Sequence, residues 1–222
     1  MAIPNYAFFD LETRKISTDF PDGWGADVGL PDGSKTQRNI LRMQFGVGCI
    51  FDNQGIRFYD DPMDCLAALL DDSVDAIIGY NTERFDLPVL LGSVDDQFTS
   101  GKVQLTEGFK AAYGLLKAKS IDLLRIVEAV LGHRVKLDQI TQVMFDHKKE
   151  QDGATWWPDY NSTDLQIRTR AVNYLLGDVM QLYKIYGVAH ELGQLAYKDQ
   201  MGQTRKFSIK VPTVASLRGE PF

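Results

Sequence analysis

Carboxylates beside apolar segments are the residues of this chain whose type and spacing could do chemistry. Asp10 and Glu12 end the apolar and aromatic run PNYAFFDLE, which has the composition of a buried strand. Side chains two apart on a strand project from the same face, so these two acids would repel each other unless a cation lay between them. An Asp-x-Glu pair can also be an ordinary solvated strand end. The spacing therefore indicates a cation site only together with further acids.

A further acid lies shortly after the apolar run DAIIGY of residues 75–80. A strand there would end at Asn81, and Asp86 follows five residues later in the first turn of an expected helix. An acid in this position could cap the helix, because capping favours Asp and the helix dipole favours negative charge. Capping and metal binding are compatible roles, so Asp86 stays a candidate ligand.

The last candidate acid is Asp178, in an apolar helical segment of the second half. Tyr174 lies four residues before it, and residues four apart on a helix share a face. Leu175, Val179 and Leu182 place Asp178 on or beside the apolar face of that helix. An uncompensated carboxylate is costly there, and a bound metal ion would remove the cost.

The first half of the chain is expected to form the strands and short helices that position the first acids. The strands are expected over residues 4–12, 44–51, 56–60 and 75–80. Short helices are expected after Pro62, where the missing N–H of proline costs nothing, and over residues 84–91. This order predicts an α/β fold with a mixed central β-sheet flanked by α-helices. The stretch from Arg14 to Gln37 is long for a connection, so we expect a functional or mobile loop.

The second half is expected to be mainly helical. Helices are expected over residues 121–131, 137–145 and about 163–192, the last capped by Ser162 or Thr163. Gly177 leaves room for a bend in the last helix, and Gly193 should end it. The alternation that follows predicts a C-terminal β-hairpin over about 194–212. Residues 1–222 are therefore expected to form a single domain with a core over about 4–192.

Composition narrows the class of protein. The 222 residues are 44% hydrophobic and 24% charged, as in an ordinary folded domain, and the net charge is −6. An acidic net charge argues against a protein that coats nucleic acid through phosphate neutralisation, but not against a nuclease with clustered carboxylates.

Cys49 and Cys65 are expected to be buried, reduced thiols. Residues 1–10 lack a signal-peptide pattern and no apolar run approaches 18 residues, so we expect a cytoplasmic protein that does not bind membranes.

The three acidic motifs together resemble those of the DEDD 3′-5′ exonucleases, the proofreading-type branch of the ribonuclease-H-like superfamily. They read FDLET, NTERFDLP and YLLGD, in the family's order, and the resemblance spans roughly residues 7–186. One branch of the family has His five residues before the last Asp, and the other has Tyr four before it. Position 173 is Asn and position 174 is Tyr, so the chain is similar to the tyrosine branch (DEDDy). That branch includes the exonuclease domains of DNA polymerases and ribonuclease D, and this chain is most similar to its stand-alone members.

The resemblance implies a ribonuclease-H-like fold and catalysis by two divalent ions, Mg²⁺ or Mn²⁺. Hard oxygen ligands without a nearby His or Cys favour these ions over Zn²⁺. By resemblance, Asp10 bridges both ions, and Glu12 and Asp178 hold the ion that binds the attacking water. Asp86 acts on the other ion, largely through waters. Tyr174 has a phenol with an ordinary pKa near 10, so it is expected to orient the water and the phosphate rather than to act as a base.

Contacts to the substrate are expected on either side of these motifs. Leu11 and Thr13 flank the first motif, where relatives meet the terminal nucleotide. Asn81 and Phe85 could bind the strand near its end, although Phe85 could also be a packing residue.

A polar segment before the last long helix places cations near aromatic side chains. It contains Lys148 and Lys149, followed by Trp156 and Trp157. Such a sequence suits single-stranded nucleic acid, through phosphate attraction and base stacking. A solvated lysine pair with a tryptophan pair that pins a loop is the competing interpretation.

The function expected from these residues is hydrolysis of nucleic-acid phosphodiester bonds from the 3′ end, releasing nucleoside monophosphates. Single-stranded DNA, or the frayed 3′ end of a duplex, is the expected substrate. An exoribonuclease of the ribonuclease D type would use the same site, because a few local contacts read the sugar. The fold is also compatible with a non-catalytic nucleic-acid-binding module, and the acids with a two-metal phosphatase or a structure-selective endonuclease.

Overall fold

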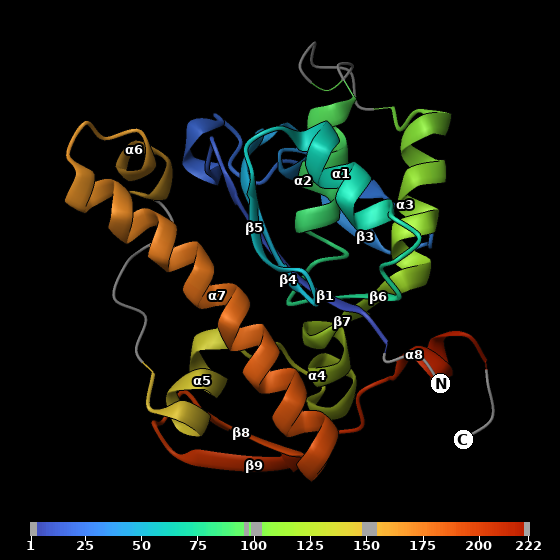
Figure 1. The fold of residues 1–222 in the computed structure, drawn as a ribbon, viewed down its shortest axis with the longest axis vertical. Coiled ribbons are helices and arrows are strands. Elements are labelled where there is room, and N and C mark those ends of the chain that lie inside the picture. The colour runs from blue at the N-terminus through green and yellow to red at the C-terminus, as the bar shows by residue number, and fades with distance from the viewer. Residues whose placement is uncertain (1–3, 96–97, 99–103, 148–154, 220–222) are drawn as a thin grey trace.

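A five-stranded sheet lies at the centre of the computed structural model, which describes residues 4–95, 98, 104–147 and 155–219 (Figure 1). Its order is β5-β4-β1-β6-β7. The strands are β1 (Tyr6–Thr13), β4 (Phe45–Asp52), β5 (Gly55–Tyr59), β6 (Ala76–Gly79) and β7 (Ser120–Asp122). β1 runs antiparallel to β4 but parallel to β6, and β6 runs parallel to β7. The expected mixed sheet is confirmed, with β1 in its middle.

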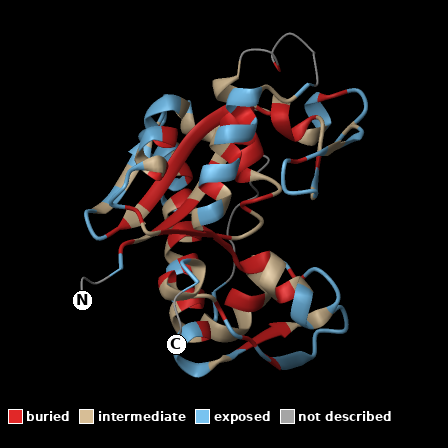
Figure 2. Cartoon of the chain, turned by 90° about the vertical axis from the view of Figure 1, so that its right-hand side faces the viewer, coloured by how far each residue is buried: buried red, intermediate tan, exposed pale blue. Residues whose placement is uncertain are grey.

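Each face of the sheet carries its own core, because alternate side chains of β1 point to opposite faces. Ala7, Phe9 and Leu11 pack with α1 (Pro62–Leu70), α2 (Asp86–Val94) and α3 (Glu107–Lys119). Phe8 packs on the opposite face. The helices there are α4 (Leu123–Leu131), α5 (Leu137–Phe145), α6 (Trp156–Tyr160) and α7 (Leu165–Leu192). Figure 2 shows the buried residues along the strands and the inward sides of the helices.

Local capping explains where the helices begin and end. Pro62 opens α1 as expected, and the Asp61 side chain accepts hydrogen bonds from the first backbone amides. The cap of α7 is Asp164, so the prediction of Ser162 or Thr163 was wrong by one or two residues. Gly193 ends α7 in the left-handed region at φ 62°, and the helix is a single element of 28 residues.

Three segments differ from the sequence-based expectation. The stretch after β1, expected as a functional or mobile loop, contains two short strands, β2 (Asp27–Gly29) and β3 (Lys35–Gln37), and two 3₁₀ turns, η1 (Ser17–Asp19) and η2 (Ile40–Arg42). Helix α3 was not expected. The expected helix from residue 121 begins at Leu123, because residues 120–122 pair with β6 as β7.

The C-terminal hairpin is confirmed, as β8 (Gln194–Lys198) paired with β9 (Thr204–Ser208). Its apolar side joins the core cluster of α5 and α7, and a short helix, α8 (Val214–Leu217), follows. None of the helices in the described residues is both long and apolar enough to cross a bilayer. Cys49 and Cys65 are buried free thiols, as expected.

Candidate metal centre

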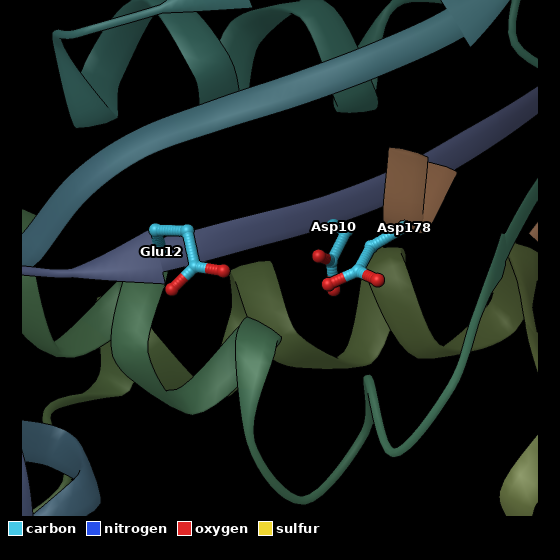
Figure 3. Close-up of side chains that lie close together, drawn as sticks. All are labelled: Asp10, Glu12 and Asp178. Atoms are coloured by element: carbon cyan, nitrogen blue, oxygen red, sulfur yellow. The ribbon is translucent and has the colours of Figure 1, made fainter. Parts of the chain in front are cut away.

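Three of the predicted acids converge where β1 passes α7. Asp10 and Glu12 project from β1 on the face where α7 packs, and α7 brings Asp178 to the same place (Figure 3). Figure 3 shows the carboxylates of Asp10 and Asp178 side by side, with Glu12 further along the strand on the same side. Each residue offers one carboxylate oxygen, and the three oxygens lie within 4.8 Å of one another. Residues 168 positions apart in sequence therefore form one acidic cluster.

The chemistry of this cluster fits a hard divalent cation. Mg²⁺ holds its oxygen ligands at about 2.0–2.1 Å, so two ligands on opposite sides of one ion are about 4.2 Å apart. The three oxygens lie within 4.8 Å of one another, which is compatible with this spacing. The cluster contains only carboxylates, and oxygen ligands favour Mg²⁺ or Mn²⁺ over Zn²⁺.

Asp86 lies at the start of α2 and is almost completely buried, with 3% of its surface exposed. It follows the N-cap position, which Phe85 occupies, so it does not cap the helix. Burial raises the pKa of Asp86 well above its usual range, and the negative charges of Asp10 and then Asp122 raise it further. Its Oδ2 has no hydrogen-bond partner among the described residues. A buried carboxylate with one unsatisfied oxygen, close to the charge of Asp10, is a group that a nearby cation would stabilise.

Tyr174 lies one helical turn before Asp178, as the sequence spacing predicts. Its ring is half-buried and packs against the core cluster that contains Phe8 and Val179. The tyrosine and the acid therefore belong to the same side of α7.

Asp122 organises the loop that carries the middle motif. It caps α4 by accepting hydrogen bonds from the first backbone amides of that helix. It also accepts hydrogen bonds from the backbone N–H of Asn81, at 2.9 Å, and of Glu83, at 3.0 Å. Asn81 adopts a φ of 72°, in the left-handed region that few non-glycine residues visit. The link from β7 to this loop was not visible in the sequence, because it joins residues 39 to 41 positions apart.

The predicted substrate residues lie in different environments. Leu11 is 4% exposed, and its side chain belongs to the core on the α2 side. Thr13 donates its hydroxyl hydrogen to the carbonyl of Lys15 at 2.6 Å. Asn81 lines two surface grooves, and Phe85 packs in part against the α2-side core. Their contacts to a substrate stay a prediction.

The tryptophan pair has a structural role at one of its two positions. Trp156 is 1% exposed, and its indole N–H donates to the carbonyl of Ala171 at 2.7 Å. Trp156 therefore pins α6 to α7, in agreement with the competing interpretation. Trp157 is half-buried, and the guanidinium carbon of Arg14 lies 5.0 Å from the centre of its ring. Lys148 and Lys149 lie outside the described residues.

No profile of a known protein family matches the sequence, and no curated protein matches it. Among solved structures, the chain is similar to the family B DNA polymerase from the hyperthermophilic archaeon Pyrobaculum calidifontis. The TM-score is 0.55 at 16% sequence identity, over 85% of this chain and 25% of the polymerase. The chain thus corresponds to about a quarter of the polymerase's length. At this identity the similarity concerns the fold alone. The similarity and the strand order of the sheet both agree with the ribonuclease-H-like fold expected from the motifs.

Proposed function

We propose that the chain is a metal-dependent 3′-5′ exonuclease that hydrolyses nucleic-acid phosphodiester bonds. The observation that carries this proposal is the convergence of Asp10, Glu12 and Asp178 within 4.8 Å on a ribonuclease-H-like fold. A polymerase is among the structures with a similar fold, and the tyrosine branch of the DEDD exonucleases includes exonuclease domains of DNA polymerases. Motif order, fold and acidic cluster therefore support the same class of reaction.

The residues divide into two tasks in this proposal. Asp10, Glu12 and Asp178 would hold divalent ions, and Asp86, whose carboxylate is close enough to interact electrostatically with Asp10, would act on the second of two ions. When bound, such ions activate a water and stabilise the leaving oxygen in an in-line attack on phosphate. Tyr174 would donate a hydrogen bond that orients the water or the phosphate, because a phenol is a poor base at neutral pH.

Single-stranded DNA is the proposed substrate, with the products leaving as nucleoside monophosphates. RNA is the alternative, because discrimination between the sugars depends on a few contacts to the 2′ position. A non-catalytic binding module would be expected to have lost one or more ligands. All four acids are present, and three of them converge in the structure, which argues against a non-catalytic module.

The test is hydrolysis by chelator-treated protein to which single cations are returned. DNA and RNA single strands of the same sequence would each be incubated with Mg²⁺, Mn²⁺ or Ca²⁺, using wild type, Asp10→Asn and Asp72→Asn. Asp72 is an exposed acid outside the cluster and serves as the matched control. We expect Mg²⁺ or Mn²⁺ to restore hydrolysis in wild type and Asp72→Asn but not in Asp10→Asn. Metal-independent hydrolysis, or full activity of Asp10→Asn, would contradict the proposal.

A further inference from the structure

A positively charged pocket, separate from the acidic cluster, lies beyond the end of β1. It has a volume of about 300 Å³, and its lining includes Arg14, Lys15 and Arg42 together with Phe20 and Phe98. None of the described residues that line it is an acid. In a chain whose net charge is −6, a pocket with three cations and no carboxylate among its described lining residues is an exception to the overall charge.

Within the part of the chain that the structure describes, none of these three cations forms an ion pair with a carboxylate. Arg42 donates to the side-chain oxygen of Asn39 at 3.2 Å and lies over the ring of Phe20 at 5.3 Å. Arg42 also interacts electrostatically with Asp22, but Asp22 forms its ion pair with Arg38. Like charges gathered in one pocket repel, so an anionic ligand would stabilise the arrangement.

The walls of the pocket favour a compact anion with an apolar part. Phe20 and Phe98 are 8% and 1% exposed, so they form a fixed apolar wall rather than mobile surface side chains. Arginine recognises phosphate through two parallel hydrogen bonds, and lysine binds it as a point charge. The volume is at the lower end of the range for ligand pockets, enough for a phosphate with part of a nucleotide.

Arg14 connects this pocket to the candidate metal centre. It follows Glu12 by two residues, lines the pocket, and lies over Trp157. Trp157 in turn lies close to β1 and β4, as the surroundings of Gly46 show. A Cβ atom placed on Gly46 would lie 2.7 Å from the Glu12 carbonyl oxygen and 3.3 Å from the Trp157 ring. The backbone N–H of Arg14 and of Lys15 donate to the carbonyls of residues 44 and 43, both at 2.9 Å, which fixes both residues beside β4.

We propose that the pocket of Arg14, Lys15 and Arg42 binds a phosphate group of the nucleic acid processed at the neighbouring metal centre. This inference rests on the proposed function. The phosphate has two sources with the same chemistry, a phosphodiester of the bound strand and a released nucleoside monophosphate. In either case the pocket supplies positive charge that the acidic cluster itself lacks.

The test measures binding in the presence of EDTA, so that it does not depend on hydrolysis. Fluorescence anisotropy of a 5′-labelled single-stranded DNA oligonucleotide would be recorded against salt concentration for wild type, Arg42→Gln, Lys15→Gln and Lys110→Gln. Lys110 is an exposed lysine on α3 outside the pocket and is the matched control. We expect the two pocket variants to bind about tenfold more weakly. Each lost phosphate contact should also reduce the slope of log affinity against log salt by about 0.7.

Calorimetric titration with a nucleoside monophosphate separates the two sources. Saturable binding that is lost in Arg42→Gln assigns the pocket to the mononucleotide, whereas an effect on the oligonucleotide alone assigns it to the strand. Lys15→Gln repeats the test if Arg42→Gln fails to fold, because the backbone of Lys15 makes its hydrogen bonds to Met43 and Thr13. Wild-type affinity and salt slope in folded pocket variants, for both ligands, would overturn the inference. Arg42-dependent binding without any hydrolysis by wild type would instead count against the proposed function alone.

Discussion

Replacing Asp178 with asparagine is expected to inactivate the protein and to stabilise its metal-free form. Asp178 is 6% exposed, and its oxygen lies within 4.8 Å of oxygens of Asp10 and Glu12. Two unit charges 4.8 Å apart, the outer limit for this cluster, repel by about 3.5 kcal/mol at an effective dielectric constant of about 20. Asp10 and Glu12 are half-buried, and solvent screening there reduces this repulsion, so we expect a gain of about 1–3 kcal/mol without metal. Asparagine has the same shape as aspartate, so the packing of α7 should not change.

Thermal unfolding at neutral pH measures this gain. For a chain of this size, each kcal/mol shifts the Tm by about 2–4 °C, so the variant should melt about 2–12 °C above wild type in EDTA. Mg²⁺ that binds only the folded state stabilises it by mass action. Wild type should therefore gain Tm in Mg²⁺, and the variant should gain less because it has lost a ligand.

Asp72→Asn, at an exposed site outside the cluster, should leave both melting curves unchanged. A lower Tm for Asp178→Asn in EDTA, together with an unchanged response to Mg²⁺, would refute the reasoning. It would mean that the Asp178 carboxylate is a structural hydrogen-bond acceptor rather than a metal ligand.

Three further predictions concern single residues. The raised pKa of Asp86 lies above its value in the unfolded chain, so its contribution to metal-free stability is present at acid pH and lost as pH rises through the folded pKa. Urea unfolding across pH should show this decline in wild type and a flatter profile in Asp86→Asn. Tyr174→Phe should lower kcat by about ten- to a hundredfold without abolishing it, as steady-state hydrolysis would show. Burial raises the pKa of Cys49 to about 12, so mass spectrometry should find this thiol unalkylated in the folded protein.

Local pattern explains which elements could be predicted from the sequence. The buried strand β1 and its paired acids are visible because apolar residues and acids lie next to each other in the chain. Helix α3 also has a local signal, with a Thr106 cap and buried Phe109, Tyr113 and Leu116 at helical spacing, although it was not predicted. β7 has no such signal, because three residues become a strand only by pairing with β6.

The parts of the site that could not be predicted depend on contacts between distant segments. The order of the three motifs identifies the four acids in the sequence, but the distances between their carboxylates depend on how α7 crosses β1. The hydrogen bonds of Asp122 join β7 to the loop after β6, which lies about 40 residues earlier in the chain. The cationic pocket brings Arg14 and Lys15 together with Arg42, from η2, and its charges look like ordinary surface residues in the sequence.

The most direct test of the central claim is a time course with a 5′-labelled single strand in Mg²⁺, resolved to single nucleotides. The proposed function predicts a ladder that shortens by one nucleotide at a time from the 3′ end. It also predicts that a blocked 3′ end stops the reaction, whereas a blocked 5′ end does not. An intact strand, a single internal cut, or shortening that begins at the 5′ end would contradict the assignment of Asp10, Glu12 and Asp178 as the centre of a 3′-5′ exonuclease.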